Sequence, residues 1–131
     1  MSGAAGVHVG QDDLAPAAAR QLLGPGRHVG YSTHTTVQVE AASIEPVTYI
    51  AIGPVFGTRT KATGYEPIGL ELVSDAARLS GGVPIVAIGG ITIETAPAVI
   101  AAGASSVAVI ADLLATGDPA ARVRAFLDAL A

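Results

Sequence analysis

Hydroxyl, guanidinium and ammonium groups stand side by side in the stretch GPVFGTRTK, residues 53–61. They follow an apolar run that is typical of a buried strand, and they belong to Thr58, Arg59, Thr60 and Lys61. A lysine gives a phosphate a point charge, while threonine hydroxyls and backbone N–H groups add directional hydrogen bonds. A surface lysine is usually just solvated, but this combination at a strand end favours an anion-binding loop.

Two later loops also have features of phosphate sites. The segment AIGGITIE, residues 87–94, predicts a strand, a Gly-Gly turn and the start of a helix. Backbone N–H groups ahead of a helix N-terminus attract anions through the helix dipole. In barrels of strand–helix units the last two such loops often share this task, and the next loop here is Val109-Ile110-Ala111. A tight turn that requires positive φ explains the glycines equally well.

An acidic loop, GQDD at residues 10–13, follows the first predicted strand. Asp12 and Asp13 could hold Mg²⁺, which takes few protein oxygens together with substrate phosphates. On spacing alone, helix capping by either carboxylate before Pro16 is the favoured interpretation.

The segment YSTHT, which starts at Tyr31, offers hydroxyls and a histidine after the second predicted strand. No acidic partner is fixed in the sequence, so a hydrolase triad is unsupported, and Thr33 or Thr35 is expected to cap the following helix. Metal-ligand spacing is absent from the three histidines, His8, His28 and His34. Of these, His8 is expected to be a packed, hydrogen-bonded side chain within a strand.

These loops are positioned by alternating strands and helices. Strand-like apolar runs lie at Val7–Val9, His28–Tyr31, Tyr49–Phe56, Pro84–Ile88 and Ser106–Ile110. Segments with helical spacing lie at about Pro16–Leu23, Thr36–Ser43, Gly69–Leu79, Glu94–Ala102 and Pro119–Leu130, the last with Asp118 as its expected N-cap. Such alternation predicts right-handed crossovers and a parallel α/β sheet.

Two parallel architectures fit this pattern. A five-stranded doubly wound sheet suits the length, whereas a TIM barrel better explains why polar and glycine signals follow every strand. A complete barrel has eight units and about 250 residues, so five units would leave it open.

Composition excludes several classes of protein. Of the 131 residues, 50% are hydrophobic and 14% are charged, which is typical of one globular domain, here residues 1–131. The net charge of −4 gives no electrostatic basis for nucleic-acid binding, and the lack of cysteine excludes disulfides and a cysteine nucleophile. Neither a signal peptide nor an apolar run of about 18–20 residues is present, so we expect a soluble cytoplasmic protein without a membrane partner.

Five ordered motifs give the chain a close resemblance to the thiamine-phosphate synthase (thiamine-phosphate pyrophosphorylase) family. They are GVHVGQDD, STHT, YIAIGPVFGTRTK, PIVAIGGIT and GASSVAVI, and the resemblance extends from residue 3 to the end. It implies the TIM (β/α)8-barrel fold and a transferase of thiamine biosynthesis. The family's reaction joins hydroxymethylpyrimidine diphosphate to thiazole phosphate with Mg²⁺ assistance and releases pyrophosphate.

The resemblance also implies roles for individual residues. Asp13 is similar to a Mg²⁺ ligand, and Ser32 and Lys61 are similar to residues that contact the pyrimidine diphosphate and are therefore the expected catalytic residues. The expected ligands of the thiazole phosphate are Thr58, Arg59, Thr60, Gly90, Ile110 and Ala111. Small phosphorylated molecules are the partners that this resemblance implies.

Two departures from the family pattern are visible. Family members commonly have serine at the position of Ala111, where a backbone N–H can carry the role. Three further βα units precede GVHVG in the family and supply a basic segment and an Asn-Asp pair for the diphosphate and Mg²⁺. The resemblance therefore implies a partial barrel of about five C-terminal units, and an isolated chain of this extent is expected to lack part of the site.

Two alternatives to a synthase remain open. The related thiazole tautomerases resemble the synthases, but some carry a catalytic histidine where this chain has Pro54, which favours the synthase. A non-catalytic phosphate-binding module has the same motif support. In every case the open face of a partial barrel is expected to promote self-association, because it would expose apolar side chains that a closed barrel buries. These are side chains such as Val7, Val9, Ile50, Ile52 and Val86, or their neighbours on the strands.

Overall fold

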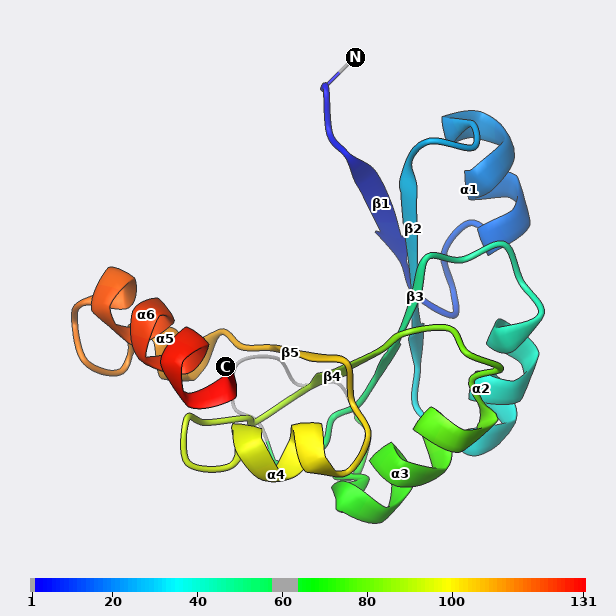
Figure 1. The fold of residues 1–131 in the computed structure, drawn as a ribbon. Helices are drawn as coiled ribbons and strands as arrows, with labels where there is room; N and C mark the ends of the chain where they lie inside the picture. The colour runs from blue at the N-terminus through cyan, green and yellow to red at the C-terminus, as the bar shows by residue number, and fades with distance from the viewer. Residues whose placement is uncertain (1, 58–63) are drawn as a thin grey trace.

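Five strands and six helices alternate through the described part of the chain, residues 2–57 and 64–131 of a computed structural model (Figure 1). In chain order they are β1 (Gly6–Val9), α1 (Pro16–Leu23), β2 (His28–Thr33), α2 (Thr36–Ser43), β3 (Tyr49–Ile52), α3 (Gly69–Leu79), β4 (Ile85–Ile88), α4 (Ala96–Ala101), β5 (Ser106–Ala108), α5 (Ala111–Leu114) and α6 (Pro119–Leu130). The predicted alternation is confirmed, and α5 is one short helix more than the sequence analysis expected.

The strands form one parallel sheet in the order β1-β2-β3-β4-β5, so each strand pairs with the next one along the chain. A doubly wound sheet would instead reverse its strand order at a switch point. The strand direction turns progressively from β1 to β5, and helices α1 to α4 follow one side of the sheet (Figure 1). This is the arrangement of consecutive units of a TIM barrel, and the prediction of a partial barrel is confirmed.

The core lies between the sheet and these helices. Val29, Ile50 and Ile52 on the strands and Val39 and Val73 on the helices are fully buried. Burial of an aliphatic side chain of this size contributes about 1.5–3 kcal/mol, so this layer is the main apolar source of stability.

Alternate strand positions point to the opposite face of the sheet, which would be the interior of a closed barrel. His8, Ser32 and Tyr49 meet on this face through hydrogen bonds. Ile88 shares it and is 37% exposed. The uncovered face, defined by these four residues, is thus more polar than the face that the helices cover.

Of the two alternatives for the open face, the neighbours of Val9, Ile50 and Ile52 occupy it, and these three residues do not. Their side chains lie on the helix-covered face and are at most 5% exposed. Their neighbours on the strands, such as Tyr49, occupy the uncovered face instead. Without a fixed register, the sequence could not say which of two adjacent apolar positions faces the helices.

Two helix caps were predicted correctly. The Thr35 hydroxyl accepts a hydrogen bond from the N–H of Gln38 at the start of α2, and the Asp118 carboxylate accepts one from the N–H of Ala121 in α6. The proposed cap of α1 by Asp12 or Asp13 is wrong, because Ala15 holds the N-cap position and no side chain caps this helix.

Several boundaries differ from the sequence prediction, and three of the differences concern the loops around the pocket. Strand β3 ends at Ile52 rather than Phe56, and β5 ends at Ala108 rather than Ile110. Helix α4 begins at Ala96 rather than Glu94, because Thr92 and Thr95 form a hydrogen-bonded turn ahead of it. The residues that follow these strands form the site loops.

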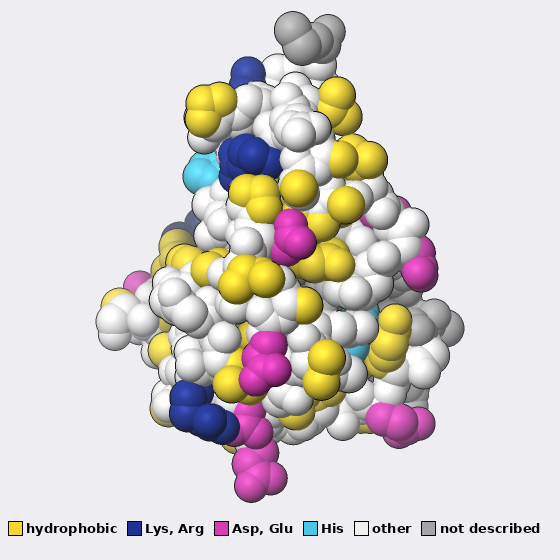
Figure 2. All heavy atoms as spheres, turned by 90° about the vertical axis from the view of Figure 1, so that its right-hand side faces the viewer, with side chains coloured by type: hydrophobic (Ala, Val, Ile, Leu, Met, Phe, Trp, Pro, Cys, Tyr) yellow, Lys and Arg dark blue, Asp and Glu magenta, His cyan; other side chains and the backbone are white. Residues whose placement is uncertain are grey.

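The outer surface over α1, α2 and α3 mixes hydrophobic side chains with separate acidic and basic groups (Figure 2). Leu22, Val37 and Ile44 are among its exposed apolar residues. In the part of the chain that the structure describes, no helix has the length and apolarity needed to cross a membrane.

Candidate functional site

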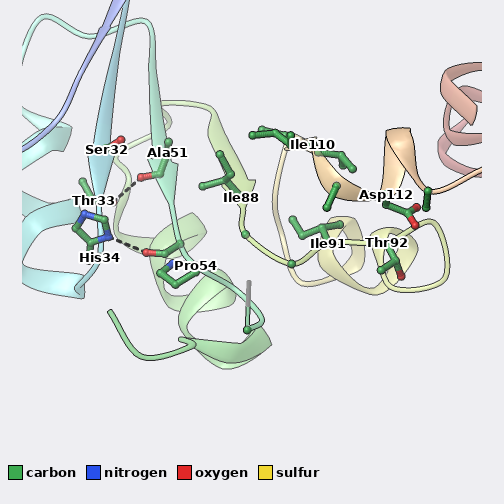
Figure 3. A pocket seen from close by; sticks show the side chains of 18 residues that line it. Ser32, Thr33, His34, Ala51, Pro54, Ile88, Ile91, Thr92, Ile110 and Asp112 are labelled. Atoms are coloured by element: carbon green, nitrogen blue, oxygen red, sulfur yellow. Dashed lines mark hydrogen bonds between the residues drawn. The ribbon is translucent and has the colours of Figure 1, made fainter. Parts of the chain in front are cut away.

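A pocket of about 590 Å³ opens at the carboxyl ends of β2 to β5 (Figure 3). Parallel strands place the loops that follow them along one edge, which is where TIM barrels build their sites. Its wall includes Ser32, Gly53 and Ile88 at or near the strand ends, Gly90 from the loop that follows β4, and Asp112 from the first turn of α5.

Four of the residues singled out in the sequence line this pocket together. Ser32 comes from β2, Gly90 from the loop after β4, and Ile110 and Ala111 from the start of α5. Ile110 is 55% exposed at the pocket surface. The structure thus brings these residues to one place, and their roles as substrate ligands stay predictions.

Thr58, Arg59, Thr60 and Lys61, the other predicted ligands, lie outside the described residues. Gly57, the residue that precedes them, lines the pocket. Their connection to the site therefore rests on the sequence and on this neighbour.

The Gly-Gly turn after β4 packs tightly against the loop after β3. Gly89 and Gly90 have φ angles of +102° and +63°, which glycine adopts without strain. A Cβ atom on Gly89 would lie 2.6 Å from the Cα of Pro54, and one on Gly90 would overlap the carbonyl oxygen of Gly57. Both glycines are thus required by the close approach of the two loops, whatever ligand they bind.

The predicted helix dipole directly behind Gly90 is absent from this loop. Helix α4 begins only at Ala96, and the N–H of Thr92 donates to the hydroxyl of Thr95 at 2.9 Å. The N–H of Ile93 donates to the Asp112 carboxylate at 3.0 Å. Protein acceptors therefore take up some of the N–H groups that were expected to face an anion.

Asp112 is a pocket residue that the sequence analysis missed. Its carboxylate accepts hydrogen bonds from Nε and Nη2 of Arg122 on α6 at 2.9–3.2 Å. The two side chains are 12% and 19% exposed, and the guanidinium also lies 5.9 Å from the ring centre of Phe126. Asp118, as the expected N-cap, indicated helix α6 but not that its Arg122 pairs with a residue of the pocket wall.

His34 is a second pocket residue whose partners could not be read from the sequence. Its Nδ1 forms a hydrogen bond of 2.8 Å with the carbonyl oxygen of Gly53 (Figure 3). Its ring stacks on Tyr65 at 3.6 Å between centroids. Of the two threonines considered as caps of α2, Thr35 has that role, while the buried hydroxyl of Thr33 donates to the carbonyl oxygen of Ala51.

Ser32 belongs to a hydrogen-bonded group on the uncovered face. Its hydroxyl lies 2.6 Å from Nε2 of His8, and Nδ1 of His8 lies 2.9 Å from the Tyr49 hydroxyl. The prediction that His8 is hydrogen-bonded is confirmed, but its side chain is exposed rather than packed. Desolvation lowers the pKa of His8, and the nearby Asp13 carboxylate partly offsets that effect.

Asp13 does not line the pocket. Its Oδ2 accepts a hydrogen bond of 2.7 Å from the N–H of Gly10 and closes the turn after β1. Across the described residues, no group of three or more His, Asp or Glu side chains is arranged to hold a metal ion. A single carboxylate still fits Mg²⁺, which takes one or two protein carboxylates together with waters and substrate phosphates.

Comparisons with known proteins point in one direction. The family described as "Thiamine monophosphate synthase" matches residues 1–113. A thiamine-phosphate synthase of Koribacter versatilis is 50% identical over 125 residues, which make up 95% of this chain and 58% of that protein. One of Roseiflexus castenholzii is 41% identical over 126 residues, or 96% of this chain and 55% of that protein.

Solved structures extend the likeness to the fold. A thiamine phosphate pyrophosphorylase from Pyrococcus furiosus is similar with a TM-score of 0.85 and 27% identity, over 97% of this chain and 59% of that one. A 3-hexulose-6-phosphate synthase has the same fold at a TM-score of 0.70 and 20% identity, over 98% of this chain and 63% of that one.

The chain is shorter than the proteins that it resembles. It spans between 35% and 58% of the length of three curated relatives, all thiamine-phosphate synthases. The family match nevertheless covers most of the sequence and includes Ser32, Gly90, Ile110 and Ala111. The chain therefore belongs to the thiamine monophosphate synthase family.

Proposed function

We propose that the chain contributes the C-terminal units of a thiamine-phosphate synthase, which joins hydroxymethylpyrimidine diphosphate to thiazole phosphate. The observation that carries this proposal is the convergence of Ser32, Gly90, Ile110 and Ala111 on one pocket. A volume of about 590 Å³ lies within the range of about 300–1,000 Å³ that is usual for small-molecule sites.

The proposed reaction breaks the bond between the pyrimidine methylene carbon and the diphosphate oxygen, and forms a bond from that carbon to the thiazole nitrogen. The departing diphosphate gathers negative charge, which Lys61 and the Ser32 hydroxyl are proposed to stabilise. The loops at Gly90 and Ile110–Ala111 hold the thiazole phosphate, so that its ring nitrogen lies close to the reacting carbon.

Asp13 is the proposed protein ligand for Mg²⁺. When bound, the ion would neutralise diphosphate charge and so assist its departure. The proposed substrates are small anions. That the protein is cytoplasmic stays a prediction.

A thiazole tautomerase is the less favoured enzyme. Pro54, which occupies the position of the catalytic histidine in some tautomerases, lines the pocket and has no group that can transfer a proton. A non-catalytic phosphate-binding module would use the same pocket and differ only in lacking turnover.

Self-association through the open side of the sheet is also proposed. Strands β1 and β5 form the two edges of the described sheet, and unpaired edges favour pairing with another chain.

The pocket assignment can be tested with a pair of charge substitutions. Ile110→Glu places a negative charge at the pocket surface, and Ile44→Glu places the same charge at an 87% exposed position beyond α2. We expect measurable binding of thiazole phosphate by the parent chain in calorimetry, a loss of at least about tenfold in Ile110→Glu, and little change in Ile44→Glu.

Turnover then separates the candidate functions. The chain is supplied with the N-terminal units of a relative, and formation of thiamine phosphate is measured. Equal binding in both variants would place the thiazole phosphate elsewhere, and binding without turnover in the completed protein would favour the non-catalytic module.

A further inference from the structure

His8, Ser32 and Tyr49 come from three adjacent strands and form one continuous hydrogen-bond chain. His8 on β1 reaches Ser32 on β2 through Nε2 and Tyr49 on β3 through Nδ1, at 2.6 Å and 2.9 Å. The His8 and Tyr49 rings are also stacked, with centroids 5.6 Å apart and planes inclined by 26°.

Gly30 provides the space for this contact. It lies on β2 between the two rings, paired with both His8 and Tyr49 in the sheet register. A Cβ atom at Gly30 would overlap the Tyr49 ring and lie 2.6 Å from Nδ1 of His8. The missing side chain on the central strand therefore lets residues on non-neighbouring strands touch.

The number of protons limits how this chain can be oriented. A neutral imidazole has one N–H and one bare nitrogen, while each hydroxyl has one proton to donate. Either Tyr49 donates to Nδ1 and Nε2–H donates to Ser32, or Ser32 donates to Nε2 and Nδ1–H donates to Tyr49. A phenol, with a pKa near 10, is far more acidic than an alkyl hydroxyl and is the better donor to a bare imidazole nitrogen.

We propose that His8 is a positioning residue whose Nε2–H donates a hydrogen bond to the Ser32 oxygen, while its Nδ1 accepts a hydrogen bond from the Tyr49 hydroxyl. The Ser32 O–H is then free to donate to an anion in the pocket. Ser32 lines that pocket, whereas His8 and Tyr49 support it from outside. The anion part of this inference rests on the proposed function, since the diphosphate is the expected ligand. The orientation of the hydrogen bonds does not depend on it.

Histidine NMR on the intact chain tests the orientation directly. Long-range ¹H–¹⁵N spectra distinguish a protonated from a bare ring nitrogen, and His8→Gln assigns the His8 signals. We expect protonated Nε2 and bare Nδ1 in the parent chain. Tyr49→Phe should shift His8 toward the other tautomer, and Tyr31→Phe, the same change on the helix-covered side of β2, should not.

Titration with inorganic pyrophosphate tests the consequence for the anion. Ser32→Ala should weaken binding by about tenfold or more, the effect of losing a hydrogen bond to a charged group. Tyr49→Phe should weaken it by roughly two- to tenfold, the effect of a neutral hydrogen bond, and Tyr31→Phe should leave it unchanged.

Each outcome has a separate meaning. Protonated Nδ1 in the parent chain, or a Tyr49→Phe variant that matches Tyr31→Phe in both measurements, overturns the proposal. The expected tautomer without any pyrophosphate binding contradicts the proposed anion site and leaves the hydrogen-bond orientation supported. Circular dichroism of each variant confirms that it is folded.

Discussion

The protonation state of His8 determines which hydrogen bonds can form on the uncovered face. Protein atoms around it lower its pKa by desolvation, and the Asp13 carboxylate raises it by a smaller amount. The neutral form is therefore favoured in the folded chain. A neutral imidazole offers one donor and one acceptor, which matches its two hydroxyl partners.

Stability should consequently depend on pH through His8. The unfolded chain holds this residue at its ordinary pKa of about 6.5, so between that value and the lowered folded value the unfolded state binds more protons. We expect the free energy of unfolding to fall as pH drops through this window and to be unaffected by His8 above it. Urea denaturation from pH 8 to pH 5 measures the change.

His8→Gln should flatten the dependence, and His28→Gln, at the exposed start of β2, should keep the His8 contribution. A His8→Gln chain with the parent's full slope would show that another group produces it.

For single residues, the sequence indicated which side chains belong to the site better than it indicated their hydrogen-bond partners. Ser32 and Gly90 were recognisable because each follows a strand within a motif. The contact of His8 with Tyr49 was not, because the residues are 41 positions apart and meet only in one register, across Gly30. Asp112 was missed for a similar reason, since its partner Arg122 lies on another helix.

Among the elements, α6 is linked to the pocket through Arg122, whose guanidinium pairs with Asp112 at 2.9 Å and lies 3.9 Å from the Glu94 carboxylate. Arg122 binds Asp112, and Asp112 in turn accepts from the N–H of Ile93 ahead of α4. A charged pair that is largely removed from water leaves a costly unpaired group when one partner is lost. This pair therefore stabilises the wall of the pocket as well as the end of the chain.

Replacing Arg122 tests this link against a matched surface pair. Arg122→Met keeps an apolar stem near Phe126 but strands the Asp112 carboxylate, and we expect a loss of roughly 2–3 kcal/mol. Arg78→Met breaks a pair with Asp75 whose side chains are 70% and 43% exposed. That change should cost less than about 1 kcal/mol, and chemical denaturation compares the two. Similar losses in both would mean that solvent screens the Asp112 pair.

Helix positions were predictable where capping and spacing agreed. The predicted bounds of α1, α2, α3 and α6 match the structure. The start of α4 was not predictable, because the turn between Thr92 and Thr95 competes with the helix for the same N–H groups. Helix α5 has only four residues, too few to show a period.

For the whole molecule, the main feature is a sheet with one covered and one uncovered face. The sequence was sufficient for the barrel-type order, because five strand–helix repeats with polar loops after each strand are typical of it. It was not sufficient to identify the polar face, which depends on register. His8, Ser32 and Tyr49 make that face less apolar than expected.

The free edges should still make the chain associate. We expect light scattering to give a mass above that of the 12.9 kDa monomer at micromolar concentration. Ser106→Lys adds a charge at an exposed position on edge strand β5 and should lower the mass, as edge charges do in natural sheets. Val37→Lys, at a 71% exposed position on α2, is the control. A cooperative, monodisperse monomer would contradict the association.

The sequential strand order has a consequence for how such a protein can be divided and recombined. Among the described residues, each strand is bonded only to the strands before and after it in the chain. A break between two units therefore interrupts the sheet hydrogen bonds of one strand pair, and the strands beyond it keep their partners. Folds of this kind can be split, exchanged or extended at unit boundaries, because each boundary separates only one pair of bonded strands, although the buried side chains form a core that several units share.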